Sequence, residues 1–266
     1  MPLRNRAAVT SPGTVALADR VGWGEAVGMK HRRACPQLQP APSAFTGYRF
    51  PPEVILLAVR WYLRFGLSYR DLEELLAERG IEVDHVTLYR WVSRFTPLLI
   101  DAVRPCRHLV GSPWFVDETY VKVAGTWRYV YRAVDQHGQV IDVHVSARRD
   151  IAATHRFFTT ALDSHEPPDE VVTDLAHPLA HVIEELLPDT FHNADKHANN
   201  RVECAHSRLK ARLRRMRGLK RDRTAQVIIA GHAFIQNIRR GHHELGVEEE
   251  PHLRTTGAFH ELSRMI

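Results

Sequence analysis

The sequence contains no run of apolar residues long enough to form a membrane-spanning helix, which needs about 20 of them. The best candidate, residues 54–59, is interrupted by Arg60. The N-terminal residues also lack the unbroken apolar segment of a secretory signal, because Ser11, Pro12 and Gly13 interrupt it. We therefore expect a cytoplasmic protein without a membrane span.

Cysteine is scarce as well: the 266-residue chain has three, widely separated and without a Cys-x-x-Cys pair. This pattern excludes a disulfide-rich fold and a structural zinc site built on paired cysteines. Cys204 and His206 are close in sequence, but without two further ligands this pair favours ordinary packing over zinc binding.

Neither sign of charge dominates overall, since 36 Lys and Arg stand against 31 Asp and Glu, a net charge of +5. The positive excess is nevertheless concentrated, because residues 201–223 hold ten basic and only two acidic residues, a net charge of +8. A solvated helical face, the alternative, usually intersperses acids for pairing. We therefore expect this stretch to follow a nucleic-acid phosphate backbone. The contacting residues predicted in it are Arg208, Lys210, Arg212, Arg214 and Arg215.

Sustained hydrophobic periodicity is missing from residues 1–46, which hold five prolines and four glycines. Such a segment has little capacity to form a packed core. We expect a disordered tail, or an extension that precedes a misassigned start, for which Met29 is one alternative. No function is assigned to it.

Residues 47–100 have the apolar spacing of three short helices. The first two are predicted over 51–66 and 68–80, and the second begins with the pattern of a capping box. The third begins at Asp84, and we expect it to end at Pro97.

Three short helices with a tight turn before the last outline a helix-turn-helix module, whose third helix enters the major groove of DNA. The alternative is a small helical bundle that only packs against the rest of the chain. The third-helix side chains predicted to face DNA are His85, Thr87, Arg90 and Arg94.

Residues 101–246 form a second predicted domain, and residues 247–266 are expected to be a C-terminal tail. The patterns follow the order strand, strand, strand, helix, strand, helix, strand, helix, with one more helix at the end. This order is typical of a ribonuclease H-like α/β fold, a mixed sheet with flanking helices. The predicted strands lie within 114–123, 127–134, 140–145, 170–174 and near 191, and the predicted helices over 150–164, 179–187, 200–216 and 224–245.

Three acids sit where this topology brings strands and a helix together: Asp117 in the first strand, Asp174 at the end of the fourth, and Glu203 early on the long helix. Carboxylates held close together repel one another unless a divalent cation neutralises them. Hard oxygen ligands select Mg²⁺ or Mn²⁺, and two such ions about 3.5–4 Å apart stabilise displacement at a phosphodiester. For each acid alone, the alternative is a surface residue that bonds a turn.

Two apolar groups leave alternatives open. Trp127, Tyr129 and Tyr131 alternate along one strand, which favours a sheet face, with stacking on nucleic-acid bases as the alternative. A second group fits either the core or a dimer contact, and the sequence does not separate the two. Its members are Ile228, Ile229, Phe234, Ile235 and Ile238.

Several strings together resemble a known family. They are WFVDETYVKV at 114–123, YRAVDQHG at 131–138, VTD at 172–174, NNRVE at 199–203, RGLK at 217–220 and AGHAF at 230–234. The sequence resembles bacterial insertion-sequence transposases of the acidic-triad (DDE) superfamily, and within it the group named insertion sequence six. The similarity extends from about Ser43 to Gly246.

The resemblance implies a DNA transposase that exposes a 3′ hydroxyl at the ends of its element and joins it to target DNA. By motif position, Asp117, Asp174 and Glu203 would be the catalytic triad and would bind two Mg²⁺ or Mn²⁺ ions. Lys210, seven residues after Glu203 and therefore on the same helical face, would hold a phosphate nearby. The implied partners are the terminal inverted repeats, target DNA and at least a second copy of the chain, with the protein at the nucleoid when bound.

The sequence also departs from the family pattern. The interval between Asp174 and Glu203 holds 28 residues, which is short, and Leu175 and Ala205 replace a common lysine and aspartate. Two alternatives therefore stay open: a decayed copy that only binds DNA, and a host nuclease of the same fold.

Overall fold

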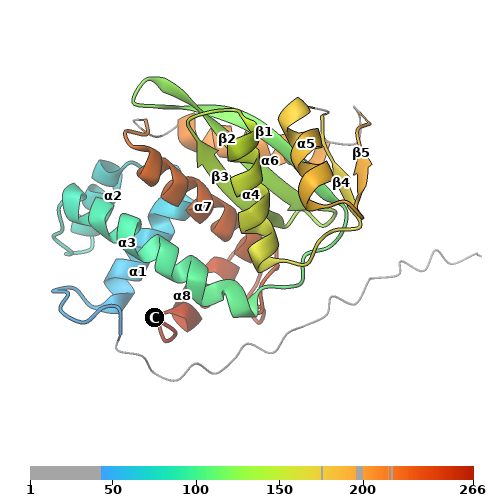
Figure 1. Cartoon of the computed structure of the whole chain (residues 1–266). Coiled ribbons are helices and arrows are strands. Elements are labelled where there is room, and N and C mark those ends of the chain that lie inside the picture. The colour runs from blue at the N-terminus through green and yellow to red at the C-terminus, as the bar shows by residue number, and fades with distance from the viewer. Residues whose placement is uncertain (1–42, 175, 196–199, 215, 217) are drawn as a thin grey trace, which may run out of the picture. The chain divides into compact units, whose positions relative to one another are not determined.

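The computed structural model of the protein describes residues 43–266, apart from 175, 196–199, 215 and 217 (Figure 1). The predicted tail thus lies mostly outside the described residues. Its last part differs from the prediction, because Phe45 is buried and stacks on Phe95 with ring centroids 4.8 Å apart. No helix in the described part of the chain has the length and hydropathy needed to cross a membrane.

The first three helices are α1 (Pro52–Arg64), α2 (Tyr69–Ala77) and α3 (His85–Val103). The capping box of α2 is confirmed, because the Ser68 hydroxyl accepts from the Asp71 amide and the Asp71 carboxylate accepts from the Ser68 amide. The Asp84 carboxylate likewise caps α3. The three helices therefore begin close to where they are expected, while their identity as a DNA-reading helix-turn-helix stays a prediction.

The expected end of α3 at Pro97 is wrong. The helix continues to Val103 and then into a short 3-10 turn, η1 (Arg104–Cys106). Proline removes one helical hydrogen bond, but Pro97 is exposed, and Leu99 and Val103 beyond it are buried in the core. Burial of the extra turn offsets the lost hydrogen bond.

A five-stranded mixed sheet follows, with strand order β3-β2-β1-β4-β5. Strand β1 is antiparallel to β2 and parallel to β4, and β4 is parallel to β5. The first and fourth strands are therefore neighbours, as predicted. Their bounds are β1 Trp114–Val123, β2 Thr126–Asp135, β3 Val140–Ser146, β4 Glu170–Val172 and β5 Phe191–Asn193.

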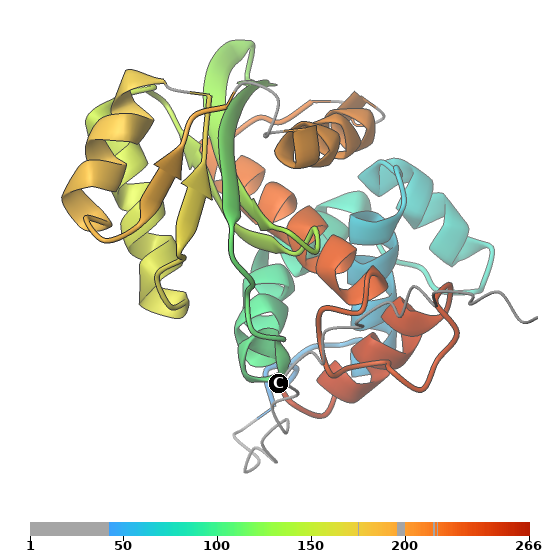
Figure 2. The same ribbon diagram turned by 90° about the vertical axis from the view of Figure 1, so that its right-hand side faces the viewer.

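Helices cover both faces of this sheet (Figure 2). On one side lie α4 (Ile151–Ser164) and α5 (His177–Leu186), and on the other lie α6 (Asn200–Arg214) and α7 (Asp222–Arg239). The element order and the layers confirm the predicted ribonuclease H-like α/β fold.

Helix α7 joins the sheet to the N-terminal helices, because it contacts β3 as well as α1 and α3. The apolar group of this helix, left open between core and dimer contact, is core: Ile228, Ile229, Phe234, Ile235 and Ile238 are all buried. The helix ends at Arg239, earlier than predicted, because Gly241 with a φ of 73° turns the chain.

The expected C-terminal tail is also wrong in part. Residues Arg254–Leu262 form α8, which contacts α7 and α1. Ala258, Phe259 and Leu262 are buried in the same core as the N-terminal helices. The other domain limits, at 46/47, 100/101 and 246/247, stay predictions.

A close approach at Gly231 generates a stability prediction. A β-carbon at this position in α7 would lie 2.7 Å from Leu63 Cδ2 and 2.8 Å from Thr96 Cγ2. Because both neighbours are buried, we expect Gly231→Val to lower the free energy of unfolding by about 1–3 kcal/mol in urea denaturation. Gly231→Ala is the control and should lose less, because alanine is better than glycine in a helix by about 1 kcal/mol. A Val variant as stable as the parent chain would contradict the close packing.

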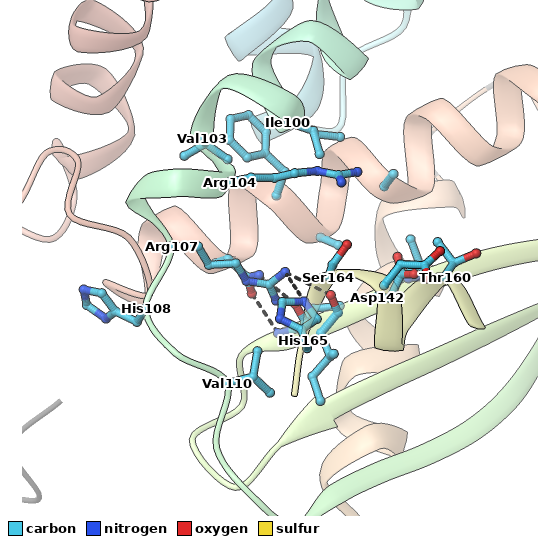
Figure 3. A pocket seen from close by; sticks show the side chains of 18 of the residues that line it. Ile100, Val103, Arg104, Arg107, His108, Val110, Asp142, Thr160, Ser164 and His165 are labelled. Carbon is cyan, nitrogen blue, oxygen red and sulfur yellow. Dashed lines mark hydrogen bonds between the residues drawn. The ribbon is translucent and has the colours of Figure 1, made fainter. Parts of the chain in front are cut away.

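A cavity of about 750 Å³ lies among α3, η1, β3, the end of α4 and α7. Figure 3 shows Arg107 and His165 side by side in it, 3.1 Å apart between Nη1 and Nε2. Arg107 also donates to the carbonyl oxygens of Val140 and Ile141. Burial raises the pKa of Asp142, on the same wall, to about 6, against the opposing effects of the Val143 amide and Arg107.

The raised pKa of Asp142 predicts a pH-dependent stability. The folded state disfavours the charged carboxylate, so this group favours folding at pH 4 and loses that contribution as the pH rises through about 6. We expect Asp142→Asn to gain roughly 1–3 kcal/mol of unfolding free energy relative to the parent between pH 4 and pH 7. The exposed neighbour Asp163, changed to Asn, is the control. A stability difference independent of pH in the Asp142 variant would refute the assignment.

Candidate active site

The register of the parallel strands brings two of the predicted acids together. Trp114 pairs with Val171 and Phe115 with Val172, so Asp117 and Asp174 follow at the same height on neighbouring chain segments. The Asp117 Oδ1 accepts a hydrogen bond from the Glu118 amide at 2.8 Å. Asp174 lies just beyond β4, exposed, and its Oδ1 accepts from the backbone amide two residues later at 3.2 Å.

A third carboxylate, Glu118, completes this cluster. Ligand oxygens of Asp117, Glu118 and Asp174 all lie within 4.8 Å of one another, and we call these three residues the acidic cluster. Sequence reasoning missed Glu118, although its place directly after Asp117 was the available signal. The donor set, three hard oxygens at a sheet edge, suits a divalent cation.

Glu118 differs from the two aspartates in its surroundings. Its side chain is 5% exposed and forms an ion pair with the Arg149 guanidinium, just before α4. Burial raises the pKa of the Glu118 carboxyl, Arg149 opposes that shift, and Asp174 and Asp117 add to it. Glu118 thus already has a cationic partner within the protein.

Glu203 is exposed on α6 and is not a member of the acidic cluster among the described residues. One turn later on the same helix face, His206 lies with its Nδ1 3.4 Å from Asp117 Oδ2. Burial lowers the pKa of His206, against the effect of its bond with Asp117, which favours a neutral ring that donates from Nδ1. The face of α6 that carries Glu203 is thereby held beside Asp117.

Arg132 is a second residue that sequence reasoning missed. It is fully buried, pairs with Asp117 in the register of β1 and β2, and donates from Nη1 to the Ala205 carbonyl oxygen of α6 at 3.1 Å. Burial lowers the pKa of its guanidinium to about 10. Arg132 therefore ties α6 to the sheet directly behind the acidic cluster.

The predicted basic stretch divides between two sides of α6. Arg208 and Arg214 are exposed, and Lys210 is half-buried with its ammonium 5.0 Å from the Tyr120 ring centroid. The prediction that Arg212 contacts DNA is wrong, because its side chain is buried and donates to a backbone carbonyl of α1. Arg215 lies outside the described residues.

The four predicted DNA-facing residues of α3 also differ in their contacts. Arg90 and Arg94 are exposed. The His85 Nδ1 lies 3.1 Å from a Glu73 carboxylate oxygen of α2, and the Thr87 hydroxyl donates to the capping Asp84 at 2.6 Å. The two arginines are thus the side chains of this set best placed to meet a ligand, and none of the four roles is tested by the fold.

Comparisons with known proteins agree with this geometry. Residues 111–242 match the family described as a DDE domain. A transposase for the insertion sequence-like element IS431mec from Staphylococcus aureus is 37% identical over 177 residues, which are 64% of this chain and 79% of that protein. A transposase for insertion sequence element IS257 in transposon Tn4003, from the same species, is 36% identical with the same coverage.

Solved structures show a weaker likeness. A simian T-cell lymphotropic virus intasome chain, in complex with a PP2A regulatory subunit, has a TM-score of 0.40 and 16% identity, covering 55% of each chain. The HTLV-2 integrase catalytic core domain in complex with magnesium has a TM-score of 0.37 and 16% identity, covering 49% of this chain and 86% of that one. Likenesses of this size carry no argument, whereas the transposases match over most of their length. The chain therefore belongs to the insertion sequence six family of DDE transposases.

Proposed function

We propose that this transposase cleaves the 3′ ends of an insertion sequence and joins them to target DNA, with Asp117, Asp174 and Glu203 as its catalytic triad. The observation that carries the proposal is the contact between His206 and Asp117, 3.4 Å from Nδ1 to Oδ2. This contact supports the proposal because His206 lies one turn after Glu203 on α6 and touches Asp117 of β1. Glu203 itself lies outside the acidic cluster, so its carboxylate would have to turn towards the two aspartates to complete the triad.

The family uses a divalent metal, and Asp117, Asp174 and Glu203 would hold two Mg²⁺ or Mn²⁺ ions. When bound, such ions stabilise the attacking and leaving oxygens of a phosphodiester displacement. His206 orients the Asp117 carboxylate, and Arg149 neutralises Glu118 so that the two aspartates remain available. Arg132 keeps α6 in place through the Ala205 carbonyl.

The exposed cations around this site support DNA as the substrate. Arg208 and Arg214 face solvent on α6. The guanidiniums of Arg221 and Arg223 lie close enough to α3 to help lower the pKa of Tyr89, after the larger effect of its hydrogen bond to Thr224. Positive charge therefore continues from α6 towards α3, where a DNA duplex would meet both.

The terminal inverted repeats are the proposed specific ligand of α3, and a homodimer or higher homo-oligomer the proposed assembly, because one synapse must hold two element ends. The two alternatives, a decayed copy that only binds DNA and a host nuclease, are not favoured by the comparisons. They remain distinguishable in a strand-transfer assay. Joining supports the proposal, binding without cleavage supports the first alternative, and structure-specific nicking supports the second.

The triad generates a catalytic prediction. Glu203→Gln should abolish joining of a labelled inverted-repeat duplex in Mg²⁺, because the amide removes a negative ligand, while binding of that duplex in a mobility-shift assay stays unchanged. The matched control is Glu184→Gln, at an exposed glutamate of α5. Asp117→Asn and Asp174→Asn should behave like Glu203→Gln. If the Glu203 variant still joins DNA, its place in the triad is wrong.

The third helix generates a recognition prediction. Arg90→Ala should weaken binding of the inverted repeat by about 1–3 kcal/mol, the usual worth of an arginine contact to a base edge. Binding of an unrelated duplex should change much less. The control is Arg264→Ala, which removes an exposed arginine near the C-terminus. Equal affinities of the Arg90 variant and the parent chain for the repeat would remove this residue from recognition.

A further inference from the structure

The hairpin of β1 and β2 extends past the helices that cover the sheet (Figure 2). Strand β4 pairs only with Trp114 and Phe115 of β1, so, among the described residues, 116–122 of β1 pair with β2 alone, and Val123 forms an isolated bridge with Leu219. The hairpin is nevertheless held firmly. The Ala124 amide at its turn donates to the Leu219 carbonyl at 2.7 Å, and Arg128 forms an ion pair with Asp222 at 2.8 Å.

Two large aromatic side chains lie exposed on this hairpin. Tyr120 is 55% exposed and Trp127 is 51% exposed, and their rings meet edge to face with centroids 5.0 Å apart. The aromatic residues that alternate along β2 differ in their burial. Tyr131 is fully buried in the core, whereas Trp127 is half exposed. The sheet-face prediction therefore holds for the inner end of the strand only.

Each exposed ring has an ammonium group against it. The Nζ of Lys122 lies 4.8 Å from the Trp127 ring centroid, and the Nζ of Lys210 lies 5.0 Å from the Tyr120 ring centroid. These cations give the aromatic surface a positive rim. We call Tyr120, Lys122, Trp127 and Lys210 the hairpin platform.

The hairpin platform lies beside the acidic cluster. Tyr120 follows Glu118 by two residues on β1, so the two side chains share a face of the sheet. At about 3.3 Å per residue, the backbones of Asp117 and Tyr120 are roughly 10 Å apart, which is a few nucleotides of a DNA strand. Lys210 lies one turn after His206, the residue in contact with Asp117.

We propose that the hairpin platform binds an unpaired base of the DNA strand whose phosphate lies at the acidic cluster. The Trp127 ring stacks on the base, the Tyr120 ring, at 89° to it, meets the edge of the same base, and Lys122 and Lys210 contact the flanking phosphates. A base within a duplex has both faces covered by its neighbours, so the ligand is a single-stranded or extruded nucleotide. The proposal rests on the proposed function, since it places the platform next to the reacting strand.

Charge complementarity favours nucleic acid over a protein partner. A protein interface on this patch would have to desolvate two lysine ammonium groups, and charged residues are depleted from the core of such interfaces. A polynucleotide instead offers a planar base to the aromatic pair and a phosphate to each cation. The platform and the exposed arginines of α6 would then follow one strand.

The test measures binding of a fluorescein-labelled oligothymidylate of about 15 nucleotides to the full chain by fluorescence anisotropy, with a chelator present. Trp127→Ala and Tyr120→Ala should each weaken binding at least about fivefold, and binding of a duplex of equal length much less. Phe191→Ala, at a side chain that is 65% exposed on β5, is the control and should have no effect. Unchanged affinity in both platform variants, or equal losses for single strand and duplex, would overturn the proposal.

A second measurement does not depend on loss of binding. Oligothymidylate should quench the tryptophan fluorescence of the parent chain, and Trp127→Phe should bind with nearly the parent affinity but lose most of the quenching. Quenching that persists in Trp127→Phe would overturn the proposal. A Trp127→Ala variant that changes its oligomeric state but keeps its affinity for oligothymidylate would overturn it as well. The chelator prevents the joining reaction, so these binding measurements test the hairpin platform alone. A chain that stacks on the oligonucleotide but never joins DNA would support the platform and contradict only the proposed function.

Discussion

The like charges of Asp117, Glu118 and Asp174 are the constraint around which the site is built. Parallel pairing of β1 with β4 sets the two aspartates at one height, and the oxygens of all three residues come within 4.8 Å of one another. Like charges this close repel one another unless cations compensate them, and Asp174 and Asp117 add to the raised pKa of Glu118. Arg149 compensates Glu118, and on the proposed function a divalent metal would compensate the two aspartates. The pairing of β1 with β4 thus concentrates negative charge at one place on the sheet, with Arg149 against one of its three carboxylates.

Helix α6 serves both stability and the site because its faces have different partners. Its inner face buries Val202 and Leu209 and carries Arg212 into α1. One edge presents His206 to Asp117, and the opposite surface presents arginines to solvent. A substitution on the inner face of α6 would therefore disturb both the core and the position of His206 against Asp117. The stability of this helix and the geometry of the acidic cluster are coupled in this way.

Local sequence determined much of the fold. The capping residues Ser68 and Asp84 start α2 and α3 where expected, and alternating and helical periodicities predict the order of strands and helices. Two of the three predicted triad residues, Asp117 and Asp174, also come together as that order implies. Periodicity and capping depend on residues a few positions apart, so they can be read along the chain.

The features that sequence misjudged depend on distant neighbours. Whether a cation of α6 meets solvent or protein is decided by what packs against it, and for Arg212 that is a carbonyl oxygen 150 residues away. Glu118 joins the acidic cluster only because a loop after β4 comes alongside, and Pro97 fails to end α3 only because the core covers the next turn. The sequence by itself determined which elements form and which residue types they carry. Tertiary contacts decided which of those side chains join the acidic cluster, face solvent or enter the core, since burial is a property of neighbours in space.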